Sequence, residues 1–251
     1  MREIFSPRGG ETTMTSRRSK QLGTGALILA LLAALAACQP ETTPLPPTAS
    51  AEMSVETVAA TEATPVEDSA GAVLIIVGNL FDEIEYIAYT RELGEAGYRV
   101  LFGSETLGTI QSEHTHRENW PIAVEVDVAL ADVVVTDYDA IILMGDFDLT
   151  AFPWDHPEAA AEIDRIMQEA VEANIIVGAT WEGVTSLAHS GVIEGMEVTA
   201  PLLTCADVLP HYGVTCTSVA PVLRNGRILT ARDHPYCWLF VEMLIEMLQE
   251  G

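Results

Sequence analysis

The sequence predicts an α/β fold in which a mostly parallel sheet carries helices on both faces. Segments with apolar residues at helical spacing separate runs that are apolar at nearly every position. A strand has this composition when both faces of its sheet are covered, and strands that alternate with helices form parallel sheets. The apolar runs are AVLIIVG (72–78), AIILM (140–144) and NIIVGA (174–179).

The first half of the domain predicts a strand–helix–strand unit. After the first of these strands, residues 81–96 carry apolar side chains at helical spacing, and Gly97 provides a stop. YRVLFG (98–103) predicts the next strand. A polar stretch, 104–120, follows it, and we expect a short strand at 125–128.

The second half continues the alternation and closes with a hairpin and a helix. Asn225-Gly226 is a strong signal for a tight hairpin turn. The expected elements are a helix at 157–173, the strand at 174–179, a short helix that ends at His189, a hairpin that pairs 219–223 with 227–230, and a closing helix at 235–249.

The N-terminal segment resembles the export signal of bacterial lipoproteins. A basic cluster, RRSK (17–20), precedes the apolar run ALILALLAALAA (26–37), which is too short for a relaxed membrane span. The run closes with LAAC, which resembles the lipobox, whose cysteine is diacylated and becomes the new N-terminus. We therefore expect residues 1–38 to be a signal peptide and Cys38 to carry the lipid. The alternative is an uncleaved anchor helix, which would also tether the chain.

Residues 39–71 are rich in Pro, Thr, Ala and Glu and have almost no large apolar side chains. Such a segment cannot bury enough apolar area to offset its chain entropy, so we predict a disordered linker. The folded domain is expected at 72–251. Since a diacylated cysteine anchors stably, the predicted location is the cell membrane, with the domain on its extracytoplasmic face.

The charge of the chain is strongly negative. Seven arginines, no lysine and 35 acidic residues lie from Cys38 onward, which leaves a net charge of −28. Such a field repels phosphate backbones and anionic lipid headgroups, so nucleic-acid binding and direct adsorption to a membrane are excluded as functions. Solubility, or adaptation to salty surroundings, explains the charge most simply. Capture of cations or of basic partners is the alternative.

Several stretches of the domain resemble the PfpI/DJ-1 superfamily in their order and spacing. The resemblance covers 72–248 and implies a flavodoxin-like three-layer sandwich, related to class I glutamine amidotransferases. The matching stretches are AVLIIVGNLFDEIEY (72–86), DYDAIILMGD (137–146), ANIIVGATWEG (173–183), SGVIEGMEVTAP (190–201) and RNGRILTAR (224–232).

In that superfamily a nucleophilic cysteine stands on a sharp strand-to-helix turn, usually within Ala-x-Cys-x-Gly. This chain has ATWEG at 179–183, so the resemblance implies that Trp181 stands at the nucleophile position. An indole cannot act as the nucleophile, because it offers no thiolate. We therefore expect the chain to lack the cysteine-dependent catalysis of its relatives.

Other positions that the resemblance identifies also depart from the usual pattern. The acid of the first loop becomes Asp82, and the Gly-Gly turn becomes Gly145-Asp146. Glu182 follows the nucleophile position, where His is frequent, and Ala200 stands where other branches have a His.

Three carboxylates, those of Asp82, Asp146 and Glu182, are expected to converge at the carboxyl edge of the sheet, where open α/β folds bind ligands. They could bind a hard cation, a sugar or an amine, act as acid and base, or be solvated remnants of a lost site. The expected pocket comprises Asp82, Gly145, Asp146, Thr180, Glu182 and Gly183 around Trp181.

From these residues we expect a pocket that binds a small ligand or a protein partner. One alternative is a hydrolase or lyase of the same superfamily that uses Asp82 and Glu182 as acid and base. The other is a pure interaction module, since family members commonly dimerise. No cofactor is predicted.

Three cysteines of the domain lie away from the turn. Cys205 and Cys216 form a disulfide or stay as free, buried thiols, and the sequence leaves both open. Cys237 is expected to pack in the terminal helix. His114 and His116 share one face of an extended segment, which makes at most half of a metal site, because zinc needs three or four ligands.

Overall fold

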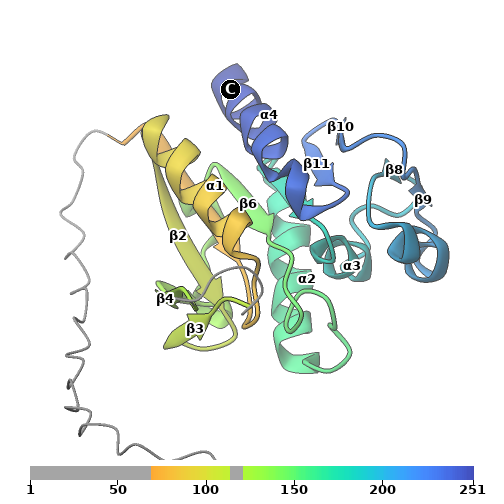
Figure 1. The fold of residues 1–251 in the computed structure, drawn as a ribbon, viewed down its shortest axis with the longest axis horizontal. Helices are drawn as coiled ribbons and strands as arrows, with labels where there is room; N and C mark the ends of the chain where they lie inside the picture. The colour runs from red at the N-terminus through yellow and green to blue at the C-terminus, as the bar shows by residue number, and fades with distance from the viewer. Residues whose placement is uncertain (1–68, 114–120) are drawn as a thin grey trace, which may run out of the picture. The chain divides into compact units, whose positions relative to one another are not determined.

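The computed structural model describes residues 69–113 and 121–251. Within them the largest sheet has seven strands in the order β10-β11-β7-β6-β1-β2-β5 (Figure 1). Every pairing is parallel except the hairpin of β10 with β11. The strands are β1 (Gly71–Ile76), β2 (Tyr98–Ser104), β5 (Val128–Ala129), β6 (Ala140–Leu143), β7 (Ile176–Thr180), β10 (Val222–Asn225) and β11 (Ile228–Ala231).

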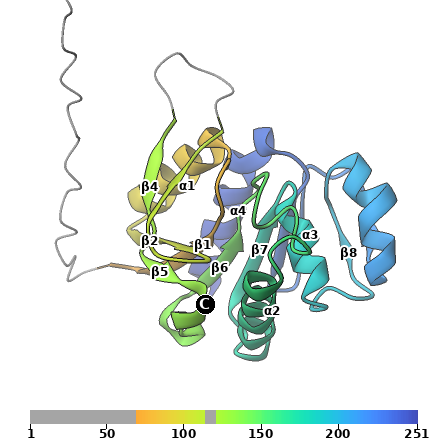
Figure 2. The same ribbon diagram turned by 90° about the horizontal axis from the view of Figure 1, so that it is seen from below.

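Helices cover both faces of this sheet. α1 (Glu83–Glu95) and α4 (Cys237–Glu250) pack on one face, whereas α2 (Pro157–Glu172) and α3 (Gly183–His189) pack on the other (Figures 1 and 2). The flavodoxin-like α/β sandwich that the sequence predicts is therefore confirmed.

Strand β1 shows why the central strands are apolar at every position. Val73 and Ile75 join the core beneath α1 and α4, whereas Leu74 and Ile76 join the core beneath α2 and α3. All four side chains are fully buried. Because successive side chains of a strand point to opposite faces, a strand between two helical layers has no polar face.

Several short elements differ from the expected ones. Instead of one strand at 125–128, the chain forms β4 (Ala123–Glu125) and β5, and β4 pairs antiparallel with β3 (Thr109–Gln111). The main chain turns between β4 and β5, where the Phe102 amide donates to the Asp127 carboxylate at 2.7 Å. This contact spans 25 residues, so local sequence patterns carry no sign of it.

A further small pair, β8 (Glu197–Val198) with β9 (Thr215–Cys216), lies on the opposite side of the domain from β3 and β4 (Figure 1). The segment between β8 and β9 contains two short helical turns, Thr204–Val208 and Leu209–Tyr212. A strand was expected at 198–201, but its pairing with β9 and the two turns were not expected from the sequence.

The strand order creates a topological switch point at the centre of the sheet. From β1 the chain passes to β2 on one side, and from β6 it passes to β7 on the other. The segments that leave the carboxyl ends of β1 and β6 therefore diverge. In open α/β sheets this divergence is where ligands bind.

The predicted signal peptide and nearly all of the predicted linker lie outside the described residues, as does Cys38. The last predicted linker residue, Gly71, begins β1. Among the helices that the structure describes, none has the length and apolar character needed to cross a bilayer.

Candidate functional site

Trp181 lies on the turn between β7 and α3, and we call residues 180–183 the elbow. Its φ angle is +47°, in the left-handed region that residues other than glycine rarely adopt. The Trp181 amide donates to the Ala231 carbonyl at 3.0 Å. Gly183 must be glycine, because a Cβ there would lie 2.5 Å from the Leu143 carbonyl oxygen. The sharp strand-to-helix turn expected from the sequence is present.

The indole of Trp181 packs against two rings from other loops. Its centroid lies 4.5 Å from that of Phe147 and 5.7 Å from that of His234, both edge to face. Gly145 makes room for it, since a Cβ at Gly145 would lie 2.9 Å from the Trp181 Cβ and Cε3 atoms. The indole thus fills the space above the elbow.

Beneath the elbow lies a buried carboxyl group, that of Glu85. The Thr180 hydroxyl donates to Glu85 Oε2 at 2.7 Å, and the Gly145 amide approaches the same oxygen at 3.3 Å. Tyr89 Oη donates to the Thr180 hydroxyl at 3.2 Å. Burial raises the pKa of Glu85 to about 8, with a smaller contribution from the charge of Asp82. Glu85 is therefore mostly protonated at neutral pH.

Asp82 caps the first turn of α1, and its expected role in the pocket stays a prediction. Its Oδ1 accepts from the amides of Ile84 at 2.8 Å and Glu85 at 3.0 Å, as the N-cap of α1. The first turn of α1 carries Glu85 inward on the buried face of the helix, as Tyr89 is one turn later. Glu85 is the acid that sequence reasoning missed. The D-x-x-E pattern at 82–85 is the available signal, because a capping box begins this way.

Asp146 is also structural. Its fully buried carboxylate accepts from three backbone amides, those of Gly78 at 2.7 Å and of Asp148 and Thr150 at 2.9 Å each. Burial raises the pKa of Asp146 to about 6, and the three hydrogen bonds oppose this increase. Asp146 holds the loops after β1 and β6 together. The carboxylates of Asp82 and Asp146 are therefore both occupied by backbone amides, and a shared site of the three acids around Trp181 stays a prediction.

Glu182 is the member of that set that faces an open pocket. It is half-buried and accepts from the Thr204 hydroxyl at 2.7 Å. Burial is the main cause that raises the pKa of Glu182, and the Thr204 hydrogen bond opposes it.

The pocket beside Glu182, which we call the elbow pocket, has a volume of about 330 Å³. A second carboxylate, Asp207, lies on its rim, and Trp181 is not among the residues that line it. Its apolar wall comes from two segments far apart in the sequence. This wall comprises Phe147, Phe152, Trp154, Leu203 and Val208.

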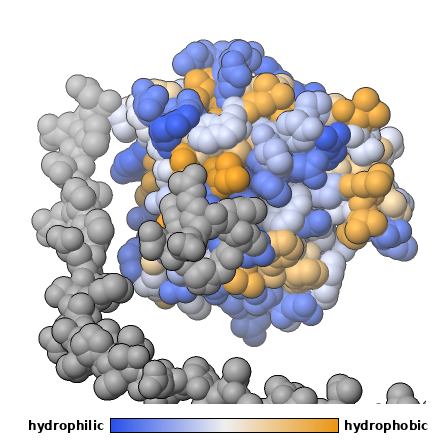
Figure 3. Space-filling view, in the orientation of Figure 1, coloured by the Kyte–Doolittle hydropathy of each residue, from blue (hydrophilic) through white to orange (hydrophobic). Residues whose placement is uncertain are grey.

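The surface around the elbow pocket is also apolar. Trp154 is 54% exposed and Leu203 is 72% exposed. Apolar side chains gather at the right of the space-filling view, over the region near β8 and β9 (Figure 3). Large exposed apolar patches of this kind mark sites that bind ligands or partners.

In the structure Cys205 and Cys216 form a disulfide, with their Cα atoms 5.2 Å apart. The bond ties the turn that carries one wall of the elbow pocket to β9. Cys237 is a buried free thiol, and burial raises its pKa to about 12. A thiol with this pKa provides almost no thiolate at neutral pH.

His114 and His116 lie outside the described residues, so a metal site there stays a prediction. Within residues 69–113 and 121–251, the His, Cys, Asp and Glu side chains form no group of three or more that could hold a metal ion. Ala200 is fully buried.

Known proteins resemble this domain along its whole length. The family model for the DJ-1/PfpI family matches residues 71–247. A deglycase of Thermococcus kodakarensis is 27% identical over 184 residues, which are 68% of this chain and 98% of that protein. A deglycase of Pyrococcus abyssi is 27% identical over 183 residues, which are again 68% of this chain and 98% of that protein.

Solved structures share the fold at lower identity. A ThiJ/PfpI domain protein from Brachyspira murdochii superposes with a TM-score of 0.63 at 19% identity, over 73% of this chain and 99% of that one. Drosophila melanogaster DJ-1beta superposes with a TM-score of 0.59 at 19% identity, over 72% of this chain and 91% of that one. With the family model matching most of the chain, this protein belongs to the DJ-1/PfpI family.

Proposed function

We propose that this protein is a binding member of the DJ-1/PfpI family that carries out no cysteine-dependent catalysis. The elbow pocket binds an apolar molecule that has a cationic head, and the lipid on Cys38 holds the domain at the extracytoplasmic face of the cell membrane. One observation carries the proposal: the indole of Trp181, rather than a thiol, occupies the strained position of the elbow and packs against Phe147.

The other thiols of the described domain support the loss of cysteine chemistry. Cys205 and Cys216 are bonded to each other, and the raised pKa of Cys237 keeps its thiol protonated. Glu85 remains beneath the elbow as a protonated acid with no nucleophile above it to orient. Its hydrogen bonds to Thr180 and Gly145 now stabilise the fold.

The lining of the elbow pocket indicates the class of ligand. Three aromatic rings and two aliphatic side chains offer an apolar wall, and Glu182 and Asp207 supply negative charge. A cation beside an aromatic face and a carboxylate gains from both. The net charge of −28 from Cys38 onward concentrates cations near the domain and repels anions.

Membrane attachment rests on the LAAC motif and on the composition of the segment that follows it. The disulfide adds independent support, because such bonds form and persist in the oxidising compartments that exported proteins reach.

Calorimetric titration of the purified protein with 2-phenylethylammonium, and with phenylacetate as an anion of similar shape, tests the binding proposal. We expect the cation to bind at least ~10-fold more tightly than the anion, and Glu182→Gln to remove most of that difference, about 1.4 kcal/mol. Glu95→Gln, an equal change of charge at the far end of α1, leaves the affinity unchanged. Equal binding of the two probes, or no effect of Glu182→Gln, contradicts the proposal.

An enzymatic function is the second candidate, because both curated relatives described above are named deglycases. The version that uses Asp82 and Glu182 as acid and base has little support. The Asp82 side chain caps α1 through two backbone hydrogen bonds, and Asp82 is not among the residues that line the elbow pocket beside Glu182. A pure interaction module would use the exposed apolar surface around Leu203 instead of the pocket.

A further inference from the structure

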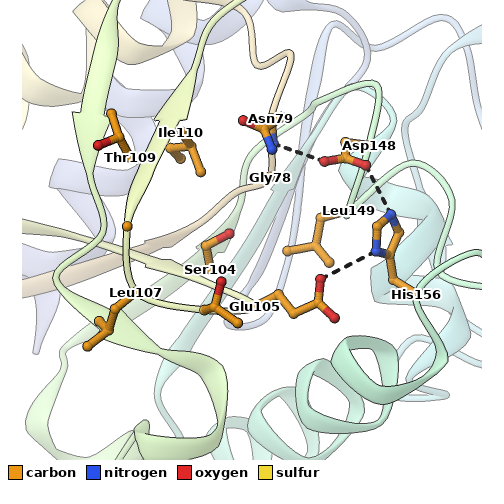
Figure 4. A pocket seen from close by; sticks show the side chains of 12 residues that line it. Gly78, Asn79, Ser104, Glu105, Leu107, Thr109, Ile110, Asp148, Leu149 and His156 are labelled. Carbon is orange, nitrogen blue, oxygen red and sulfur yellow. Dashed lines mark hydrogen bonds and ion pairs between the residues drawn. The ribbon is translucent and has the colours of Figure 1, made fainter.

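A second cavity lies at the topological switch point of the sheet, away from the elbow (Figure 4). We call it the switch-point cavity. Its volume is about 180 Å³, and its walls come from the segments that follow β1, β2 and β6. The general rule for open α/β sheets places ligands at this position. No local sequence pattern points to it.

One wall of the cavity carries a chain of three polar side chains (Figure 4). His156 Nε2 lies 3.0 Å from Asp148 Oδ1, and His156 Nδ1 lies 3.5 Å from Glu105 Oε2. The other oxygen of Asp148 accepts from the Asn79 amide at 3.2 Å. His156 therefore lies between two carboxylates, hydrogen-bonded to Asp148 and within ion-pair distance of Glu105. Even with His156 protonated, the three side chains keep a net negative charge.

Beside Glu105, the cavity is lined by the hydroxyl group of Ser104. Ser104 is only 5% exposed, and its side chain points into the cavity in Figure 4. None of the hydrogen bonds between the described residues involves its hydroxyl. The Ser104 hydroxyl is not among the fully enclosed polar atoms that lack a partner, so its oxygen is open to the cavity and can hydrogen-bond to a ligand that enters it.

The switch-point cavity and the elbow pocket share no lining residue. The loop after β6 separates them: Phe147 faces the elbow pocket, whereas Asp148 and Leu149 face the cavity. Asp146, through its three backbone hydrogen bonds, fixes this loop. A ligand in the cavity is therefore recognised by different residues from a ligand in the elbow pocket.

We propose that the switch-point cavity is a second binding site, specific for a small aliphatic ammonium compound. An ammonium group is a donor with no acceptor, and it matches the carboxylates of Glu105 and Asp148 together with the Ser104 hydroxyl. No arginine or lysine lines the cavity, so an anion would find no partner of opposite charge except a protonated His156. The cavity volume of about 180 Å³ is below the range of about 300–1,000 Å³ that is typical of sites for drug-sized ligands, which suits a small compound.

Calorimetric titration of the purified protein with 1,4-diaminobutane tests this site, with 1,4-butanediol and succinate as uncharged and anionic comparators. We expect one diamine bound per chain, at least ~10-fold more tightly than either comparator. Ser104→Ala and Glu105→Gln each lower the affinity for the diamine several-fold, whereas Glu95→Gln leaves this affinity unchanged. Both substitutions are mild, since Ser104→Ala removes one oxygen atom and the Glu105 side chain is 47% exposed. Thermal melting verifies that each variant is folded.

Unchanged affinity in both Ser104→Ala and Glu105→Gln overturns the proposal, as does equal binding of the diol. Loss of diamine binding in Glu182→Gln instead places the diamine in the elbow pocket and also overturns it. Because Glu182 lines only the elbow pocket and Ser104 only the cavity, failure of one proposal is distinguishable from failure of the other.

Discussion

The rings of Phe147 and Trp181 meet edge to face at 89°, with their centroids 4.5 Å apart. Phe147 comes from the loop after β6 and Trp181 from the turn after β7, so the contact joins the two loops that border the elbow pocket. The indole therefore packs behind Phe147, which lines the elbow pocket.

Phe147→Ala is expected to lower the free energy of unfolding by about 1–2 kcal/mol, because it removes buried area and the aromatic pair. Phe152→Ala is the matched control, since Phe152 is 39% exposed, Phe147 is 40% exposed, and Phe152 also meets a tryptophan edge to face. Its partner Trp154 is 54% exposed, so the loss is smaller. Urea unfolding measures both, and equal losses speak against a packed Trp181.

Glu85 makes stability depend on pH. The unfolded chain releases this proton near pH 4.5, whereas the folded protein keeps it up to pH 8 or so. The folded state therefore binds more protons between these values, and its stability falls as pH rises. Because the pKa of Asp146 is about 6, the effect of Asp146 on the pH dependence of stability lies mostly below that pH.

Between pH 6 and pH 8, Glu85 alone is expected to cost roughly 2 kcal/mol of stability. Glu85→Gln keeps an acceptor for Thr180 and removes the titration, so its stability stays nearly level over this range. Urea unfolding at the two pH values measures the difference. A wild-type protein whose stability is the same at both contradicts a protonated Glu85.

The disulfide supports the wall of the elbow pocket. Closing an 11-residue separation contributes about 3 kcal/mol in the chain-entropy description. Replacing both Cys205 and Cys216 by Ser is expected to lower stability by a similar amount. It should also weaken the binding of 2-phenylethylammonium more than the binding of 1,4-diaminobutane, because no residue of this segment lines the switch-point cavity. Equal weakening of the two ligands would show that the disulfide acts on the whole fold.

Lipid attachment at Cys38 is tested by metabolic labelling in a bacterial host. We expect labelled palmitate to enter the protein and the Cys38→Ser variant to carry none. Cys237→Ser, a change to a buried thiol in α4, keeps the label. Label that persists in Cys38→Ser, or that is lost in Cys237→Ser, argues against lipidation at the LAAC motif.

The sequence predicted the central sheet well because its strands carry their own signal. A strand such as β1, buried on both faces, must be apolar at every position, and the helices between strands show the complementary spacing. β8 and β9 have two residues each, too few for any periodicity to appear. Tertiary contacts alone define them.

The candidate site was harder to predict than the fold. Trp181 could be placed because the elbow motif is local, but the roles of Asp82 and Glu85 depend on which residue begins α1. The Asp82 side chain accepts hydrogen bonds from two amides of the first turn, so the helix begins there. Glu85, three residues later, then takes the buried position on α1. The elbow pocket combines residues 147–154 with residues 203–208, a pairing that no local pattern contains.

Absence of cysteine chemistry is the central claim, and a deglycase assay on the purified protein with a glycated peptide tests it most directly. We predict that the wild-type protein releases the sugar fragment no faster than buffer does, because the indole of Trp181 fills the space above the elbow and Cys237 stays protonated. Turnover by the wild-type protein that exceeds the uncatalysed rate, and that a thiol-blocking reagent abolishes, would contradict this account.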